Sequence, residues 1–505
     1  MPEESASNLE NTMSADDLDL RSQRLLKADR MKENGMSPYG HNRISGLSSM
    51  NSVKEAFAAL PEGSEEKLNF RVAGRMMARR IMGKSLFANL KDQGGNLQLY
   101  VQKNIVGDEN YDLFKDLDIG DILSAQGYAF RTRTGEISLH VQSFELLAKG
   151  IRSLPEKYHG LKDTEQRYRQ RYVDLIINDE VRRCFEMRSR IISGIRRYLD
   201  SKGFMEVETP MMQSLAGGAA ARPFKTFYNA LGCPMYLRIA PELYLKRLLV
   251  GGFEKVYEIG RNFRNEGMDR RHNPEFTGLE IYQAYSDCRG MMELIEDLIT
   301  TVAQETAGTL TFTAADSHQV NLTRPWRRVP YQDLIREKMG QDWFSLPLAS
   351  QREKALALGL NIPEGMQESD ITHEIYDKCI EGTLIQPTFV TRLPAFLVPL
   401  AKRCPDDPNL VDVYELIING QELSPGYSEL NDPMEQRSRF DAQAIGRDDL
   451  EGEVDRIDED FLTALEYGMP PAGGLGLGID RVVMLLTGAE SIRDVILFPQ
   501  MRPQK

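Results

Sequence analysis

The sequence has few cysteines and no long apolar segment. Its five cysteines are scattered, and no two of them form a CxxC pair. This argues against a disulfide framework or a zinc site and fits reduced thiols. No apolar run approaches the roughly 20 residues of a membrane-spanning helix. Residues 1–19 are acidic and polar, without the apolar core of a secretory signal. We therefore expect a cytoplasmic protein with no membrane partner.

The chain also lacks an excess of basic residues, internal repeats and low-complexity segments. Its 62 Lys and Arg against 75 Asp and Glu give a net charge of −13. This excludes a chain coated in basic charge, but it does not exclude a local nucleic-acid site. A length of 505 residues is too great for one ordinary hydrophobic core. We expect two or three domains.

The first 150 residues divide into two parts. Residues 1–60 are expected to form a tail, a short charged helix over 20–34 and a serine-containing linker. From residue 61 to 150, short runs alternate in hydrophobicity between turns at 92–96 and 134–135, which predicts a small β-barrel such as an OB-fold. Arg75, Arg79, Arg80 and Lys84 form a local basic cluster. The alternative is another small barrel with a solvated basic rim.

Residues 255–285 predict two antiparallel strands joined by a cationic loop. Residues two apart on a strand share a face, so Arg264 and Glu266 are expected to point the same way, as are Glu280 and Tyr282. An arginine fork facing a pocket suits a carboxylate or a phosphate. The alternative is a surface hairpin whose charges only keep it soluble.

Two later segments add candidate chemistry. Residues 413–423 predict a hairpin with Asn419-Gly420 at its turn, flanked by Glu415 and Glu422. Two carboxylates beside a nucleotide suit Mg²⁺, although such a pair often binds nothing. Residues 473–478 are rich in glycine and lead through Asp480 and Arg481 into an apolar helix. No βαβ unit surrounds them, which argues against a dinucleotide loop.

Three segments together resemble one family. Phe263-Arg264-Asn265-Glu266 with residues 272–277 resembles motif 2 of class II aminoacyl-tRNA synthetases, and the closest match is the bacterial lysyl branch of class IIb. A helix with the strand after it (181–210) resembles motif 1, and residues 473–500 resemble motif 3. The resemblance covers residues 71–502.

The resemblance implies an α+β fold and a reaction. The expected parts are an OB-fold anticodon-binding domain (61–150) and a catalytic domain (151–505), whose antiparallel sheet is flanked by helices. Motif 2 is expected at about 254–285 and a small helical insertion at 346–385. A homodimer is implied. Such an enzyme joins L-lysine to ATP as lysyl-adenylate, releases pyrophosphate, and transfers lysine to the 3′-terminal adenosine of lysine tRNA.

Residue roles follow from the same resemblance. The catalytic residues would be Arg264, which bridges the amino acid carboxylate and the α-phosphate, together with Glu266 and Arg481. ATP would be held by Arg264, Glu266, Arg271, His272, Asn273, Phe276, Glu415 and Arg481. Glu415 and Glu422 would hold Mg²⁺, expected as several ions per subunit. In the barrel, Phe87, Gln98 and Glu136 would contact the central anticodon base, with Phe87 stacking on it.

The lysine pocket is expected to be acidic. The resemblance places Glu242, Tyr282 and Glu429 near the ε-amino group and Gly218 and Glu280 near the α-amino group, and it includes Tyr427. An aspartate enzyme would need cations there, and the sequence offers acids instead. Pro425 departs from the family, which usually has asparagine before this segment.

Three alternatives remain open at this stage. One is an aspartyl or asparaginyl enzyme, which the acidic pocket opposes. Another is the paralogue that lysylates an elongation factor, which lacks the OB domain. The last is a non-catalytic RNA-binding relative, and such relatives usually lose the arginines of motif 2 or motif 3.

Overall fold

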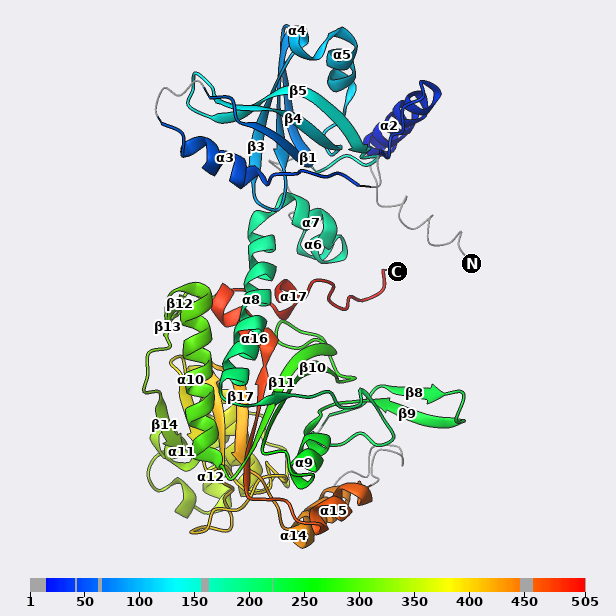
Figure 1. Cartoon of the computed structure of the whole chain (residues 1–505). Helices are drawn as coiled ribbons and strands as arrows, with labels where there is room; N and C mark the ends of the chain where they lie inside the picture. Colours follow the sequence, from blue (N-terminus) through cyan, green and yellow to red (C-terminus); the bar gives the residue numbers. More distant parts are fainter. Residues whose placement is uncertain are drawn as a thin grey trace. The chain divides into compact units, whose positions relative to one another are not determined.

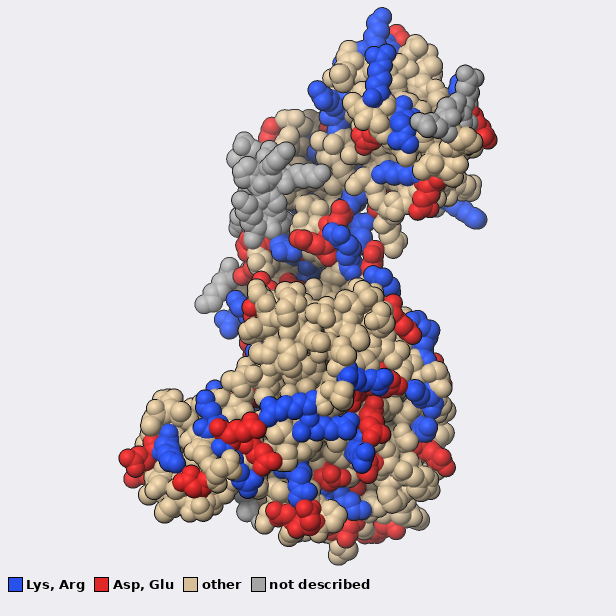
Figure 2. Space-filling view, turned by 90° about the vertical axis from the view of Figure 1, so that its left-hand side faces the viewer, with Lys and Arg blue, Asp and Glu red and all other residues tan. Residues whose placement is uncertain are grey.

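The computed structural model describes residues 15–40, 43–61, 66–155, 163–219, 221–445 and 457–504. The chain divides into two compact units, Met1–Leu161 and Lys162–Lys505. Most of the expected N-terminal tail lies outside the described residues. On the face shown in Figure 2, Lys and Arg side chains are mixed with Asp and Glu over the surface of each unit.

The N-terminal unit is built on a closed five-stranded barrel (Figure 1). Its strands pair in the order β1-β2-β3-β5-β4. The bounds are β1 (Asn69–Met82), β2 (Ser85–Lys91), β3 (Asn96–Gln102), β4 (Ile122–Arg131) and β5 (Ile137–Ala148), with α4 (Lys103–Val106) and α5 (Asp108–Asp116) between β3 and β4. The predicted alternation is confirmed in β3, where Leu97, Leu99 and Val101 are buried in the barrel core. The expected OB-fold is therefore present.

Two helices precede the barrel. They are α2 (Ala15–Glu33) and α3 (Met50–Ala58). Helix α3 lies in the segment that the sequence predicted as a linker. The Ser49 side chain accepts a hydrogen bond from the Ser52 amide as an N-cap, and Met50 and Val53 are buried. Burial of these two side chains against the barrel explains why this serine-containing segment is helical.

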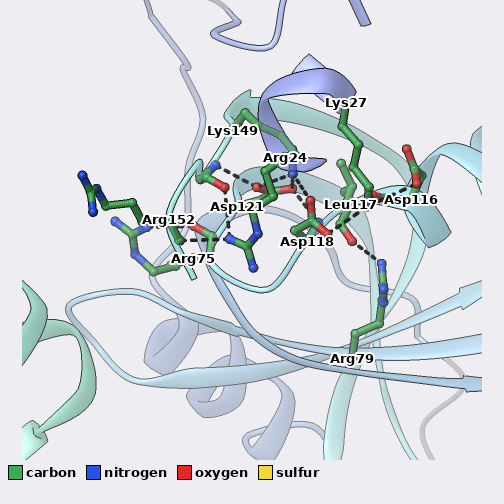
Figure 3. A network of polar contacts seen from close by, with 12 residues as sticks. Arg24, Lys27, Arg75, Arg79, Asp116, Leu117, Asp118, Asp121, Lys149 and Arg152 are labelled. Atoms are coloured by element: carbon green, nitrogen blue, oxygen red, sulfur yellow. Dashed lines mark hydrogen bonds and ion pairs between the residues drawn. The ribbon is translucent and has the colours of Figure 1, made fainter. Parts of the chain in front are cut away.

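A polar network attaches α2 to the barrel (Figure 3). The fully buried Lys149 ammonium lies 2.6 Å from Asp118 and 2.9 Å from Asp121. Lys27 of α2 reaches Asp118 at 2.9 Å, and Arg24 donates to the carbonyl oxygens of Gly150 and Arg152.

Two residues of the predicted basic cluster, Arg75 and Arg79, donate hydrogen bonds in the same part of the N-terminal unit. Arg75 donates to the Gly120 carbonyl oxygen, and Arg79 donates to the carbonyl oxygens of Lys115 and Leu117. Of the four clustered residues, Arg80 and Lys84 are exposed.

The second unit is built on an eight-stranded sheet. The strand order is β14-β15-β16-β17-β18-β11-β10-β6. The bounds are β6 (Met205–Glu206), β10 (Lys255–Phe263), β11 (Glu275–Ala284), β14 (Arg327–Pro330), β15 (Thr388–Thr391), β16 (Val413–Ile418), β17 (Gln421–Ser428) and β18 (Ala472–Gly478). The pairs β6–β10 and β14–β15 are parallel, and the others are antiparallel.

Helices cover both faces of this sheet. On one face α8 (Asp179–Ser201), α10 (Cys288–Ala307) and α16 (Ile479–Thr487) enclose the main core, with α8 beside α10 (Figure 1). On the other face α9 (Glu242–Val250) and α15 (Glu459–Glu466) pack on β10 and β11. Helix α14 (Pro433–Ile445) lies beside α15. The expected α+β architecture is confirmed.

The remaining elements are short or peripheral. Two small sheets are formed by β12 (Thr311–Thr313) with β13 (Gln319–Asn321), and by β7 (Met212–Gln213), β9 (Cys233–Leu237) and β8 (Lys225–Tyr228). The smaller helices are α6 (Thr164–Arg169), α7 (Arg171–Ile177), α11 (Tyr331–Met339), α12 (Leu348–Ala357), α13 (Glu368–Cys379) and α17 (Ile492–Val495). Helices α12 and α13 lie inside the segment 346–385 and pack around Trp343.

Candidate active site

A cavity of about 940 Å³ lies in the second unit. This size is within the roughly 300–1,000 Å³ typical of small-molecule sites. The cavity gathers most of the predicted site residues, which line it as Gly218, Glu242, Arg264, Glu266, Arg271, His272, Asn273, Phe276, Glu280, Tyr282, Glu422, Tyr427 and Arg481. Two predicted residues, Glu415 and Glu429, are not among the lining residues.

Strands β10 and β11 present the predicted cationic loop to this cavity. They pair antiparallel from Lys255 opposite Gln283 to Phe263 opposite Glu275, as the sequence predicted. Alternation along β11 turns Leu279 and Ile281 into the helix-covered core and leaves Glu280 and Tyr282 at the cavity. The expected shared face is confirmed, because the Tyr282 hydroxyl donates to Glu280 at 3.0 Å.

Arg264 provides the buried positive charge. Its guanidinium lies over the Phe276 ring at 5.2 Å, and its buried Nε has no hydrogen-bond partner among the described residues. Burial lowers the pKa of Arg264, while nearby carboxylates, foremost Glu266 and Glu280, oppose that shift. A buried donor without a partner costs free energy, and an anionic ligand would remove that cost.

Motif 3 is tied to motifs 1 and 2 by one carboxylate. Asp480 accepts a hydrogen bond from the Thr277 amide at 2.8 Å and pairs with Arg188 of α8 at 2.5 Å. Arg481, the next residue, donates to the Glu422 carbonyl oxygen. Asp269 stabilises the loop between β10 and β11 in a similar way. Its carboxylate accepts hydrogen bonds from the amides of Arg271 and His272 at 2.6 and 2.8 Å. Sequence reasoning missed Asp269 and Arg188.

Glu415 and Glu422 lie on adjacent strands β16 and β17. Asn419 and Gly420 both have positive φ, of 53° and 64°, which confirms the predicted tight hairpin. Burial, and then the charges of Glu422 and Glu381, raise the pKa of Glu415 to about 8. Among the described residues, no group of three or more acidic, His or Cys side chains could hold a metal on its own. A cation bound by this pair would have to take its other ligands from phosphate and water.

A buried cation that the sequence did not predict, Lys246, lies behind the acidic end of the cavity. Glu242, at the start of α9, accepts from the Tyr427 hydroxyl at 2.6 Å and from Lys246 Nζ at 2.8 Å through the same oxygen, Oε1. Lys246 also lies 2.5 Å from Glu429 Oε2. Lys246 was not predicted for this site, and the spacing of four residues between Glu242 and Lys246 was the available signal.

The pKa values of the other two carboxylates of this pocket, Glu280 and Glu429, are both raised. Burial, and then the charge of Glu242, raise the pKa of Glu280 to about 8. Burial also raises the pKa of Glu429 to about 8, although Lys246 opposes the shift. Each carboxylate makes the others harder to ionise.

Glycines allow these carboxylates to fit. A Cβ at Gly474 of β18 would overlap Glu429 Oε1 and lie 2.6 Å from the Tyr282 ring. Gly218 has a φ of +86°, and a Cβ there would meet Glu242 Cβ at 3.2 Å. Pro425, the departure noted in the sequence, lies opposite Glu415 in the β16–β17 register and lines the cavity.

The predicted anticodon residues lie together on the barrel. The Phe87 ring stacks on Tyr100 at 4.9 Å between centroids, and Tyr100 lies 5.2 Å from His140. Gln98 donates to Glu136 at 3.3 Å. Adjacent aromatic rings and amide groups are typical of surfaces that bind single-stranded RNA. Tyr100 was missed, although its alternation with Gln98 placed both on one face.

Comparisons with known proteins agree with this geometry. A family model described as tRNA synthetases class II (D, K and N) matches residues 163–502, and a model of an OB-fold nucleic acid binding domain matches residues 70–147. A lysine–tRNA ligase of Halalkalibacterium halodurans is 51% identical over 488 residues, covering 96% of this chain and 97% of the relative.

Other relatives carry the same name. The lysine–tRNA ligase of Carboxydothermus hydrogenoformans is 52% identical, covering 95% of this chain and 97% of its own. That of Bacillus subtilis is 50% identical, covering 94% and 96%. Within the part of the chain that the structure describes, no helix has the length and apolar character needed to span a membrane.

Proposed function

Because the chain belongs to the class II tRNA synthetase family, in its lysine branch, we propose that it is a lysine–tRNA ligase. It activates L-lysine with ATP, releases pyrophosphate, and transfers lysine to the 3′-terminal adenosine of lysine tRNA. The observation that carries this proposal is the acidic end of the cavity, where Glu242 and Glu280 line the wall and Glu242 and Glu429 hold a lysine side chain of the protein between them.

Substrate choice follows from the charge of that pocket. A lysine side chain is an apolar stem with a compact positive charge. Burying its ammonium group without carboxylates would be costly. Glu242 and Glu280 line the cavity and offer oxygens to it. An aspartate side chain would meet like charges there instead.

The first reaction step brings two anions together. The lysine carboxylate must approach the α-phosphate of ATP, and cations are needed to neutralise charge as the transition state forms. Arg264 is proposed to bridge these two groups, since its buried Nε has no other partner among the described residues. Arg271 would meet the distal phosphate, and Arg481 and Phe276 would enclose the adenine. Glu266, His272 and Asn273 would hold the base and its loop.

A divalent cation is proposed beside the phosphates. Glu415 and Glu422 would hold Mg²⁺, whose charge would offset that of the triphosphate. Burial, and then repulsion from Glu422 and Glu381, raise the pKa of Glu415, and such an ion would relieve the repulsion. Relief of this repulsion supports the assignment, and the number of ions stays a prediction.

The other parts of the proposal concern partners. The barrel face with Phe87, Gln98 and Glu136 would bind the anticodon of the tRNA. A homodimer formed through the motif 1 helix and strand is proposed, as is a cytoplasmic location, where tRNA and ATP are both available.

The test is ATP–pyrophosphate exchange with each of the twenty amino acids. Exchange with lysine alone is expected. Arg264→Ala should lower it at least about 100-fold, the scale of losing one preorganised charge-stabilising donor. Arg261→Ala is the matched control, because Arg261 lies on β10 and pairs with Glu275 outside the cavity. Exchange with aspartate or asparagine would refute the pocket assignment.

A further inference from the structure

Lys246 is a completely buried lysine behind the acidic wall of the cavity. Its side chain has an exposed fraction of 0%, and it is not among the residues that line the cavity. Its ammonium contacts Glu242 Oε1 at 2.8 Å and Glu429 Oε2 at 2.5 Å, and it lies 5.6 Å from the Tyr427 ring centroid. A group in this position cannot itself bind a ligand in the cavity, but it can act through its partners.

The partners divide into one that faces the cavity and one that does not. Glu242 lines the cavity, and both of its contacts with Lys246 and Tyr427 use Oε1. Its second oxygen is therefore left for a ligand. Glu429 has a fully buried side chain, and its Oε1 lies where Gly474 leaves space, without a hydrogen-bond partner among the described residues. Lys246 thus connects Glu242, which lines the cavity, to Glu429, which lies behind the cavity wall.

We propose that Lys246 is a positioning residue of the lysine pocket: it holds Glu242 through Oε1 and Glu429 through Oε2, so that Glu242 keeps its second oxygen directed at the substrate ammonium. This inference rests on the proposed function, because it concerns the same pocket. It also assigns to Glu429 a role as the partner of Lys246, in place of a direct contact with the substrate.

The charges around Lys246 give this role a consequence for pH dependence. The titratable groups that face it or its partners come from α9, β11 and the end of β17, and they are Glu242, Glu280, Tyr282, Tyr427 and Glu429. All five are acidic groups, and Arg238 is a cation that acts on Glu280. Lys246 opposes the rise in the pKa of Glu429, so its removal must raise that pKa further. Each carboxylate must be ionised to bind an ammonium group.

The test is lysine-dependent ATP–pyrophosphate exchange of the full chain between pH 6.5 and 9, with KM and kcat measured separately. Lys246→Met keeps the length of the side chain and removes its charge. We expect KM for lysine to rise about 10-fold at pH 7, and the acidic limb of kcat/KM to move to higher pH by about one unit, since one unit corresponds to tenfold. kcat at saturating lysine should change less.

Two further variants separate positioning from packing. Lys246→Met with Glu429→Gln removes the pair together, and it should return the acidic limb toward the wild-type position. Glu429→Gln alone removes a like charge from Glu242 and Glu280, so it should move the limb to lower pH. Lys338→Met is the matched control, because Lys338 is an exposed lysine of α11 outside the cavity, and its profile should match the wild type.

The outcomes are distinct. If Lys246→Met folds, as circular dichroism reports, and leaves both KM and the acidic limb unchanged, the residue only fills space and the inference is overturned. If that variant does not fold, the pH profile of Glu429→Gln is the test. An acidic limb of kcat/KM that stays in place or moves to higher pH overturns the inference. If wild-type protein gives no exchange with lysine, the proposed function fails first and this inference fails with it.

Discussion

The two ends of the cavity carry opposite charges that the protein leaves incompletely balanced. At one end, Arg264 has a buried donor without a partner among the described residues. At the other end, Glu242 and Glu429 share one cation, Lys246, and the pKa of Glu429 is raised to about 8. A neutral ligand would relieve neither imbalance. A ligand with anionic groups at one end and an ammonium at the other relieves both.

The largest expected effect comes from neutralising the acidic end. Glu280→Gln should lower kcat/KM for lysine by about 30-fold to 3,000-fold, because truncating one partner of a buried charge pair costs roughly 2–5 kcal/mol. The measurement is lysine-dependent pyrophosphate exchange. Glu275→Gln on the same strand is the control, since Glu275 pairs with Arg261 outside the cavity. A change below threefold in Glu280→Gln would contradict the assignment of Glu280 to the α-amino group of lysine.

A steric change at the same end should have the next largest effect. Gly474→Ala would push its methyl group against Glu429 and Tyr282, and we expect KM for lysine to rise about 5-fold to 150-fold, since overpacking costs roughly 1–3 kcal/mol. Gly382→Ala is the control, because its added methyl would meet nothing within 4 Å. Equal KM values for the two variants would show that Gly474 does not shape the pocket.

The raised pKa values predict that lysine binding depends on pH. Glu280 binds an ammonium group only when ionised, so KM for lysine should fall as pH rises from 6.5 through 8, by up to about tenfold per unit for one proton. Below pH 8 binding should release protons. Calorimetric titration in two buffers of different ionisation enthalpy would measure this release, and heats identical in both buffers would refute it.

The smallest effect on the first reaction step is expected from the barrel. Phe87→Ala should leave lysine-dependent exchange unchanged, because Phe87 belongs to the N-terminal unit. It should raise KM for tRNA in aminoacylation by about 5-fold to 100-fold, the roughly 1–3 kcal/mol of one stacked base. Leu113→Ala, at a partly buried position packed against the barrel core, controls for loss of barrel stability. If Phe87→Ala impaired exchange as well, the two functions would not be separable.

Much of the fold could be predicted because the relevant patterns are local. The alternation of Leu97, Leu99 and Val101 predicted a barrel strand, and the Asn419-Gly420 pair predicted a tight hairpin. Helix α3 was missed, because its serine-rich start is typical of a linker. What makes it helical is the burial of Met50 and Val53 against strands that lie further along the chain.

The chemical groups of the site can be identified from the chain alone: the arginines of motifs 2 and 3, the acids of the pocket and the aromatic side chains of the barrel. How the charges of these groups offset one another depends on the folded arrangement. The local sequence around Lys246 indicates one more basic residue of a surface helix, and that around Glu429 indicates a ligand contact. Only the packing of α9 against the end of β17 places them 2.5 Å apart in a buried site, where low polarity makes their charges interact strongly.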